Sequence, residues 1–360
     1  LFEEHDLDSD AVKHALATGR ATYAADVIER AVLDIATWSK LEVATFRSWL
    51  AQLPPDVVRS HPWLQLFASR TEYVTGDWRA ATRLLEELEE SLRSGLAHPD
   101  SEQIEKLVLA DRASYAAVRG EVAEAMGYAQ EALAHLAVSD AIGQTRMRAI
   151  LGVAHARAGQ VSEAARAFAG AIETAQAAGM GFAAVIFVCH LAEVQIAQGK
   201  LHLAKATCDE ARALGMVGGV PSSHSGFVGL PEGRILYEWN QLSAAEKSLV
   251  DGLNLLGAGQ IPEHFGNMYA LLAHVQWALG KQSAAEEAIQ RAVQLAQGGN
   301  IPRISALARA DRTRLWLAQG RLDLAATWAD KFCTTPEPQY LRDYEELTLV
   351  RVRLAQTRLE

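Results

Sequence analysis

Residues 152–171 read GVAHARAGQVSEAARAFAGA, and this short stretch predicts the local architecture of the chain. Gly159 is its turn residue, with a small residue seven positions before it and an alanine five after it. A bulky residue follows nine positions after the turn, and a second alanine follows at twelve. Glycine accepts the left-handed conformation that ends a helix, and small side chains let two helices approach closely. The stretch therefore predicts a helical hairpin, with a helix A before the turn and a helix B after it.

The same turn recurs along the chain at near-constant spacing. From residue 76 onward, consecutive turns are 44, 39, 40, 41, 40 and 40 residues apart. Asparagine replaces glycine once, as it often does in left-handed turns. The eight turn residues are Gly19, Gly76, Gly120, Gly159, Gly199, Asn240, Gly280 and Gly320. Five residues after each of them stands an alanine: Ala24, Ala81, Ala125, Ala164, Ala204, Ala245, Ala285 and Ala325. Alanine makes up 64 of the 360 residues, so eight matches in eight indicate a true repeat.

The offsets of small, glycine, alanine and bulky residues resemble those of tetratricopeptide repeats, lengthened here from about 34 to about 40 residues. Such hairpins stack with a constant rotation. We therefore expect an all-α fold, a right-handed superhelical solenoid with a concave groove lined by the A helices. We expect a single domain over 1–360, with a first hairpin at 1–48, an insertion and second helix A at 49–75, regular repeats at 76–340 and an incomplete last repeat at 341–360. An ordinary helix bundle is the alternative, which the eightfold register disfavours.

Two segments depart from the repeat. Residues 215–231 (GMVGGVPSSHSGFVGLP) take the place of the first turns of a helix A, so we expect that helix to be short. The segment itself is either a lid over the groove or a plain insertion. Residues 355–360 (AQTRLE) repeat residues 318–323 (AQGRLD), so we expect the chain to stop at a ninth turn and to be a piece of a longer protein.

Composition argues against several classes of function. The net charge of −10, from 34 basic and 44 acidic residues, argues against a nucleic-acid-binding surface. Three widely separated cysteines form no disulfide framework, which favours a reducing, cytoplasmic location. The sequence has no run of 18 apolar residues that could span a membrane.

Motifs for catalysis, metals or cofactors are incomplete. The run Ser222–Gly226 does not complete the nucleophile motif of a serine hydrolase, and no strand is expected before it. His190 and Glu193 lack the second histidine of a metalloprotease helix. We therefore predict no enzyme activity, no metal site and no cofactor.

Three stretches carry a more specific resemblance. Residues 11–30 (AVKHALATGRATYAADVIER), the phrase around Trp49, Leu53 and Pro62, and residues 346–356 (ELTLVRVRLAQ) are similar to MalT-like, large ATP-dependent LuxR-type transcriptional regulators. Members of that family carry an N-terminal P-loop NTPase, a helical-repeat region and a C-terminal helix-turn-helix. The resemblance implies that this chain is the repeat region, which senses an inducer and acts on NTPase and DNA-binding modules that this sequence lacks.

The groove positions of each A helix are expected at 13, 10, 6, 3 and 2 residues before the turn. From the fourth repeat onward, charged, amide and aromatic side chains gather at these positions, as a polar or sugar-like ligand requires. The candidate ligand-binding residues are Arg146, Glu193, Arg234, Tyr237, Glu238, Asn267, His274, Trp277 and Arg314.

The predicted function is that of a signal-sensing and protein-interaction domain of a cytoplasmic transcriptional regulator, binding a small polar inducer. The alternative is a scaffold that binds a peptide or partner protein in the same groove, with no small-molecule ligand. Self-association through the last, incomplete repeat is also expected, and direct contact with nucleic acid is not.

Overall fold

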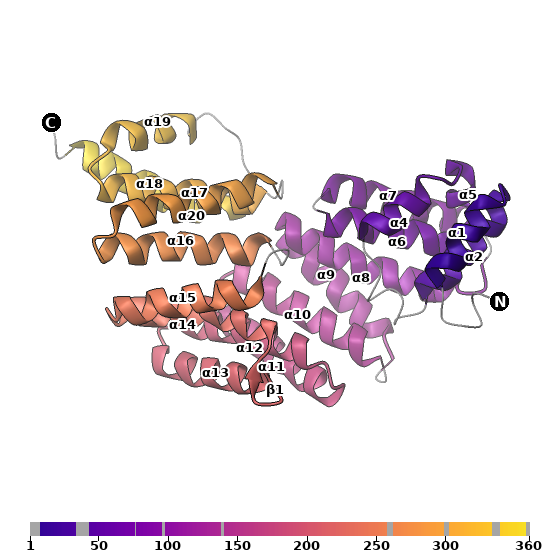
Figure 1. Cartoon of the computed structure of the whole chain (residues 1–360), viewed down its shortest axis with the longest axis horizontal. Helices are drawn as coiled ribbons and strands as arrows, with labels where there is room; N and C mark the ends of the chain where they lie inside the picture. The colour runs from indigo at the N-terminus through magenta and orange to yellow at the C-terminus, as the bar shows by residue number, and fades with distance from the viewer. Residues whose placement is uncertain are drawn as a thin grey trace. The chain divides into compact units, whose positions relative to one another are not determined.

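The computed structural model describes residues 8–33, 43–75, 77–95, 98–137, 140–257, 262–298, 302–332 and 339–357. Contacts group the chain into two compact units, residues 1–115 and 116–360, and each is described by itself. The predicted single domain of residues 1–360 stays a prediction. Both units are built from helices, as the repeat pattern predicts (Figure 1).

The first unit begins with a helical hairpin and continues through an insertion. Gly19, the turn residue between the first two helices, has a φ of 68°. The range predicted for the first hairpin, residues 1–48, also contains the start of an additional helix that spans residues 43–50. The helices are α1 Asp8–Ala17, α2 Ala21–Leu33, α4 Val43–Leu50, α5 Pro55–Arg59, α6 Pro62–Val74, α7 Trp78–Arg93 and α8 Ser101–Arg119, the last of which crosses the boundary between the units. The predicted turn residue Gly76 lies outside the described residues.

The second unit is a regular stack of hairpins. The A helices α10 to α18 each contact their own B helix, and from α12 to α18 each also contacts the next A helix, as in a tetratricopeptide-like solenoid (Figure 1). The A helices are α10 Ala141–Arg157, α12 Gly181–Ala197, α14 Gly229–Glu238, α16 Pro262–Ala278, α18 Pro302–Ala318 and α20 Gln339–Thr357. The B helices are α9 Val122–His135, α11 Val161–Ala177, α13 Leu201–Leu214, α15 Leu242–Leu256, α17 Gln282–Gly298 and α19 Leu322–Phe332.

The turn residues end the A helices by a common hydrogen-bond pattern. At Gly199 (φ 73°), the amide donates to the carbonyl of Ile196 at 2.9 Å, and the amide of Lys200 donates to that of Gln195 at 2.9 Å. This is a Schellman motif, and its left-handed residue is normally glycine. Asn240, with a φ of 57°, closes the same pattern in its hairpin. The sequence prediction of recurring hairpin turns is confirmed at these positions.

The recurring small residues lie where two helices touch. All eight alanines that follow the turns by five residues are buried. A Cβ added at Gly152 would lie 2.7 Å from the ring of Phe168, and one added at Gly233 would lie 2.7 Å from Cγ of Leu249. Side chains at these positions are therefore limited by the close approach of helix A to helix B.

The irregular segment before α14 is partly core. Strands β1 Met216–Val217 and β2 Val220–Pro221 form an exposed antiparallel ribbon, and a 3-10 helix, η2 Ser223–Val228, follows them. Phe227 and Val228 are buried, and η2 contacts α12 and α15. As predicted, α14 is short, with 10 residues against 17 in α12 and α16. Residues 223–228 replace its first turns in the core, which is incompatible with a lid role for that part.

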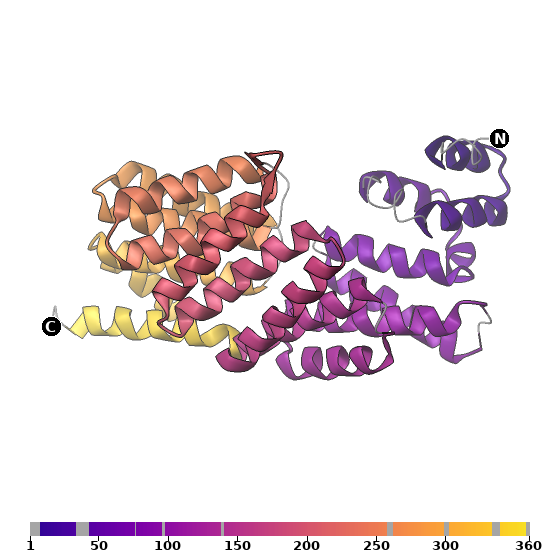
Figure 2. The ribbon, with the colours of Figure 1, turned by 90° about the horizontal axis from the view of Figure 1, so that it is seen from below.

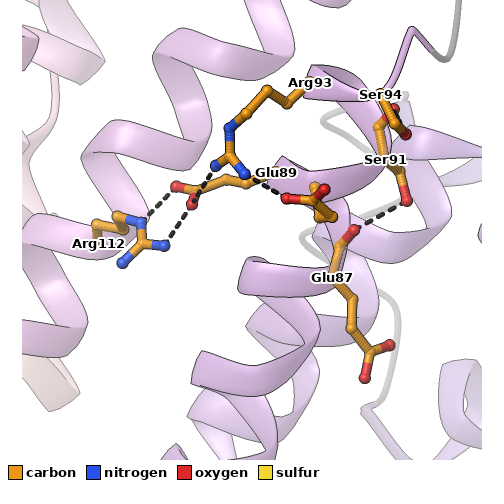
Figure 3. A network of polar contacts seen from close by, with 7 residues as sticks. Glu87, Glu89, Ser91, Arg93, Ser94 and Arg112 are labelled. Atoms are coloured by element: carbon orange, nitrogen blue, oxygen red, sulfur yellow. Dashed lines mark hydrogen bonds and ion pairs between the residues drawn. The ribbon is translucent and has the colours of Figure 1, made fainter.

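An ion-pair network joins successive hairpins in the first unit. Arg112 of α8 reaches Glu89 of α7 with two of its nitrogens, and Arg93 lies between Glu89 and Glu90 on α7 (Figure 3). Two-point contacts between guanidinium and carboxylate fix orientation as well as charge. The network therefore holds a B helix against the following A helix.

One helix of the second unit keeps an exposed apolar stripe. Leu347, Val350 and Leu354 lie three and four residues apart on α20, the yellow helix near the C-terminus in Figure 2, and all three are exposed. In the part of the chain that the structure describes, no helix is both long and apolar enough to cross a membrane.

Candidate functional site

The nine predicted ligand-binding residues all lie on A helices of the second unit. They are half-buried, apart from Glu238, which is exposed. Their positions are Arg146 on α10, Glu193 on α12, Arg234, Tyr237 and Glu238 on α14, Asn267, His274 and Trp277 on α16, and Arg314 on α18. We call this set the A-helix face.

The structure joins several of these side chains to one another or to a neighbouring A helix. Nη1 of Arg234 lies 3.1 Å from Oε2 of Glu193, which links α14 to α12. Nε2 of His274 lies 3.2 Å from Oδ1 of Asp311, which links α16 to α18. Nε of Arg314 donates to Oγ1 of Thr348 at 3.2 Å, which links α18 to α20. We call these polar contacts between successive A helices rungs.

Two of these three rungs share the same register. His274 and Arg314 stand six residues before their turns, and their partners stand nine residues before the next turn position, at 320 and 357. The first unit contains the same rung, because Nε of Arg70 lies 2.7 Å from Oδ2 of the buried Asp111. Sequence analysis identified the position six residues before the turn but missed the partner position. The polar side chains on this face therefore stabilise the stacking of A helices.

The aromatic members of the A-helix face are partly core residues. Tyr237 and Trp277 pack against the hydrophobic core of the second unit. The position ten residues before the turn, which we expected to face the groove, is buried at Cys189, Ala270 and Ala310. It points into the stack because each A helix is covered by other helices on more than one side. The exposed part of the face is therefore narrower and more polar than the pattern predicts.

One carboxylate on the face retains acceptor capacity. Oε1 of Glu193 is buried and accepts no hydrogen bond from the described residues, while Oε2 pairs with Arg234. A buried acceptor without a donor costs free energy, so a donor brought to Glu193 would be favourable.

Two thiols lie in the hairpin of α12 and α13. Burial raises the pKa of Cys208 to about 12, and the nearby carboxylates of Glu232 and Glu193 act in the same direction. Burial also raises the pKa of Cys189 well above its ordinary value, with Cys208 and Glu193 adding repulsion. Both thiols are therefore protonated at neutral pH and unsuited to nucleophilic catalysis.

A buried acidic residue that sequence analysis did not identify lies close to this hairpin. Glu232 of α14 pairs with Arg212 and Lys205 of α13, and it accepts a hydrogen bond from Ser248 of α15 at 2.6 Å. The charge is compensated on two sides, as a buried carboxylate requires. All of these partners belong to α13 and α15, so this cluster holds three helices together.

Among the described residues, no group of three His, Cys, Asp or Glu side chains is arranged to hold a metal ion.

Sequence analysis also missed a cavity of about 380 Å³ bounded by α18, α19 and α20. Arg312, Trp316 and Trp328 line it, at offsets from the turn that were not expected to face a groove. The two tryptophans and the arginine were the available signal in the sequence, but only the packing of three helices brings them together.

Solved structures with the same fold are regulators and repeat proteins of low sequence identity. NprR in complex with its cognate peptide NprX is 13% identical, with a TM-score of 0.59 and coverage of 99% of both chains. A Rap protein complexed with competence and sporulation factor is 14% identical, with a TM-score of 0.55 and coverage of 82% of this chain and 81% of that one. A signal transduction ATPase with a tetratricopeptide repeat sensor from Pyrococcus horikoshii is 12% identical, with a TM-score of 0.54, and the match covers 87% of this chain and 47% of that one.

The comparison with curated proteins finds no match. A family model described as the MalT-like TPR region matches residues 106–360, which is more than half of the chain. The chain belongs to the MalT-like TPR region family.

Proposed function

We propose that this chain is the signal-sensing domain of a cytoplasmic transcriptional regulator and that its A-helix face binds a small polar inducer. The observation that carries the proposal is the mixed-charge array of Glu193, Arg234, His274 and Arg314 on successive A helices of a MalT-like domain. Acidic and basic groups beside aromatic rings suit a ligand that both donates and accepts hydrogen bonds, such as a sugar.

The rungs supply a mechanism for relaying the signal. A ligand hydroxyl that donates to Glu193, or a ligand oxygen that accepts from Arg234, competes with the ion pair between α12 and α14. Binding then favours one spacing of the A helices over another, and such a population shift requires different affinity for the two states. The partners that receive the signal would be NTPase and helix-turn-helix modules of the full-length protein. The repeat sensor of the Pyrococcus horikoshii ATPase supports this arrangement.

The second candidate function is recognition of a peptide or partner protein by the same face, without a small-molecule inducer. It is favoured by the similarity to NprR, whose structure holds its cognate peptide, and to the Rap protein complexed with competence and sporulation factor. The two candidates differ in the ligand and share the surface.

A binding experiment separates these candidates. The chain is screened for thermal stabilisation against mono- to trisaccharides and, separately, against a library of short peptides. A ligand present at a hundred times its Kd stabilises the folded state by about 2.7 kcal/mol. Arg234→Ala is expected to weaken saccharide binding about tenfold by removing a charge-assisted hydrogen bond. The control is Arg291→Ala, which removes an exposed arginine of α17 on a B helix.

Stabilisation by peptides and not by saccharides would reject the small inducer in favour of the second candidate. If the Arg234→Ala variant and the parent chain bound a saccharide with equal affinity, the A-helix face would not be its binding site.

A further inference from the structure

The cavity between α18, α19 and α20 combines aromatic walls with positive charge. Its volume of about 380 Å³ is in the range of small-molecule sites. The rings of Trp328 and Phe332 stack with centroids 5.4 Å apart and planes 14° apart. Trp316 contributes a third ring from α18. Flat apolar walls of this kind accept a planar ring.

Among the described residues of the cavity wall, basic side chains outnumber acidic ones. The described lining includes Arg309, Arg312 and Lys331, and Glu345 is the single acidic residue among the described residues that line it. The buried Glu345 pairs with Arg309, whose Nη2 lies 3.5 Å from Oε1 of the carboxylate. Arg312 is a further cation of the described wall and lies outside this pair.

Arg312 is the cation whose position in the cavity most favours binding of an anion. Its guanidinium carbon lies 4.8 Å from the ring centroid of Trp316, which holds the group over the indole. Its Nε is buried and donates no hydrogen bond to the described residues. Burial lowers the pKa of Arg312, and the neighbouring charge of Arg309 lowers it further. An anion beside Arg312 would relieve both effects and would accept the unused hydrogen bond.

A second cavity shows that this chemistry is not a general property of the hairpins. It lies between α1 and α4, has a volume of about 520 Å³, and among the described residues that line it Lys13 alone is charged. Nζ of Lys13 already lies 3.0 Å from Asp10. Size alone therefore does not distinguish the two cavities, but the arginine held over an aromatic ring, Arg312, does.

We propose that the cavity between α18, α19 and α20 binds a small organic anion with a planar ring. The ring lies against the tryptophan and phenylalanine walls, and the carboxylate or phosphate group accepts hydrogen bonds from Arg312. The site is separate from the A-helix face, because Arg312 and Trp316 stand eight and four residues before the turn, whereas Arg314 stands six before it. The inference does not depend on the function proposed for that face.

The test uses three matched probes, 2-naphthoate, 2-naphthyl phosphate and the neutral 2-naphthamide, titrated into the full chain by isothermal calorimetry. At least one of the anions is expected to bind about tenfold or more tightly than the amide, because a charge-assisted hydrogen bond contributes that much. A preference for the carboxylate or for the phosphate identifies which anion the site takes, and either supports the proposal. Equal binding of all three probes, or no binding of any, would overturn it.

Variants locate the binding. Arg312→Gln is expected to lower the affinity for the preferred anion about tenfold, and Arg312→Lys to lower it less because the charge remains. Arg234→Gln, on the A-helix face, is expected to leave the affinity unchanged and serves as the control. Circular dichroism melting confirms that each variant is folded. An unchanged affinity in Arg312→Gln would contradict the assignment. If only Arg234→Gln bound the probe more weakly, the probe would be binding at the A-helix face and the proposal would fail.

Discussion

Helices α16 and α20 place the same register positions in opposite environments. In α16, Ala270 and Ala273, ten and seven residues before the turn, are 5% and 0% exposed. In α20 the corresponding residues, Leu347 and Val350, are 59% and 53% exposed. Helix α16 is covered by α17, its own helix B, whereas no described helix follows α20. The larger apolar residues are thus the exposed ones, so burial in this fold is determined by the neighbouring helices and not by the residue type.

The same difference in coverage by neighbouring helices explains which side chains of the second unit are paired with each other and which are left available. In the closed hairpins, polar groups such as Glu193 and Arg234 compensate each other across A helices. Around α18, α19 and α20 the packing is less complete, and a cavity with the buried, unused Nε of Arg312 remains. The closed hairpins thus pair their charges with each other and leave an acceptor at Glu193, whereas the region around α18, α19 and α20 leaves a buried donor and apolar surface.

The strongest test of the comparison introduces the same residue, leucine, at the same register position in both helices. Ala273→Leu is expected to lower the free energy of unfolding by about 3 kcal/mol, because the added atoms have no space between α16 and α17. Val350→Leu is expected to change it by less than about 0.5 kcal/mol, since the side chain is exposed. Urea unfolding followed by circular dichroism measures both. Similar losses in the two variants would show that α20 is covered in solution.

A second test uses the thiol inside a closed hairpin. Burial raises the pKa of Cys208 from 9.0 to about 12, so its stabilising contribution is complete below pH 9 and is lost as the pH rises towards 12. The expected loss by pH 10.5 is about 2 kcal/mol relative to a Cys208→Ala variant, which lacks the titrating group. The measurement is the difference in unfolding free energy between parent and variant at pH 8 and at pH 10.5. A constant difference would mean that the α12–α13 hairpin admits water to the thiol.

Local features of the fold could be predicted from the sequence because they leave marks at fixed spacing. A left-handed residue such as Gly199 and a contact alanine such as Ala204 are required wherever a hairpin closes, whatever surrounds it. The rung partners could not be predicted, because the pairing of Arg314 with Thr348 depends on the rotation between hairpins. The cavity around Arg312 was missed for the same reason, since it is created by three helices that meet only in the stack.

The smallest expected effect concerns two rungs that differ in their acceptor, a charged carboxylate in one and a neutral hydroxyl in the other. The ion pair of Glu193 and Arg234 is partly exposed, and a double-mutant cycle with Glu193→Gln and Arg234→Ala is expected to give a coupling of about 0.2–1 kcal/mol. The neutral-acceptor rung between Arg314 and Thr348, which attaches α20, is expected to give a similar coupling of about 1 kcal/mol with Arg314→Ala and Thr348→Ala.

Salt distinguishes the two rungs. In 1 M NaCl the Debye length falls to about 3 Å, so the coupling within the ion pair should decrease while that with the threonine hydroxyl is largely retained. Urea unfolding of both cycles at low and high salt gives the comparison. Loss of the Arg314–Thr348 coupling together with the ion pair would show that the attachment of α20 depends on screened charges. The closed hairpins and α20 would then both be attached to the stack by salt-sensitive electrostatic contacts. The two would differ only in how far neighbouring helices cover their side chains.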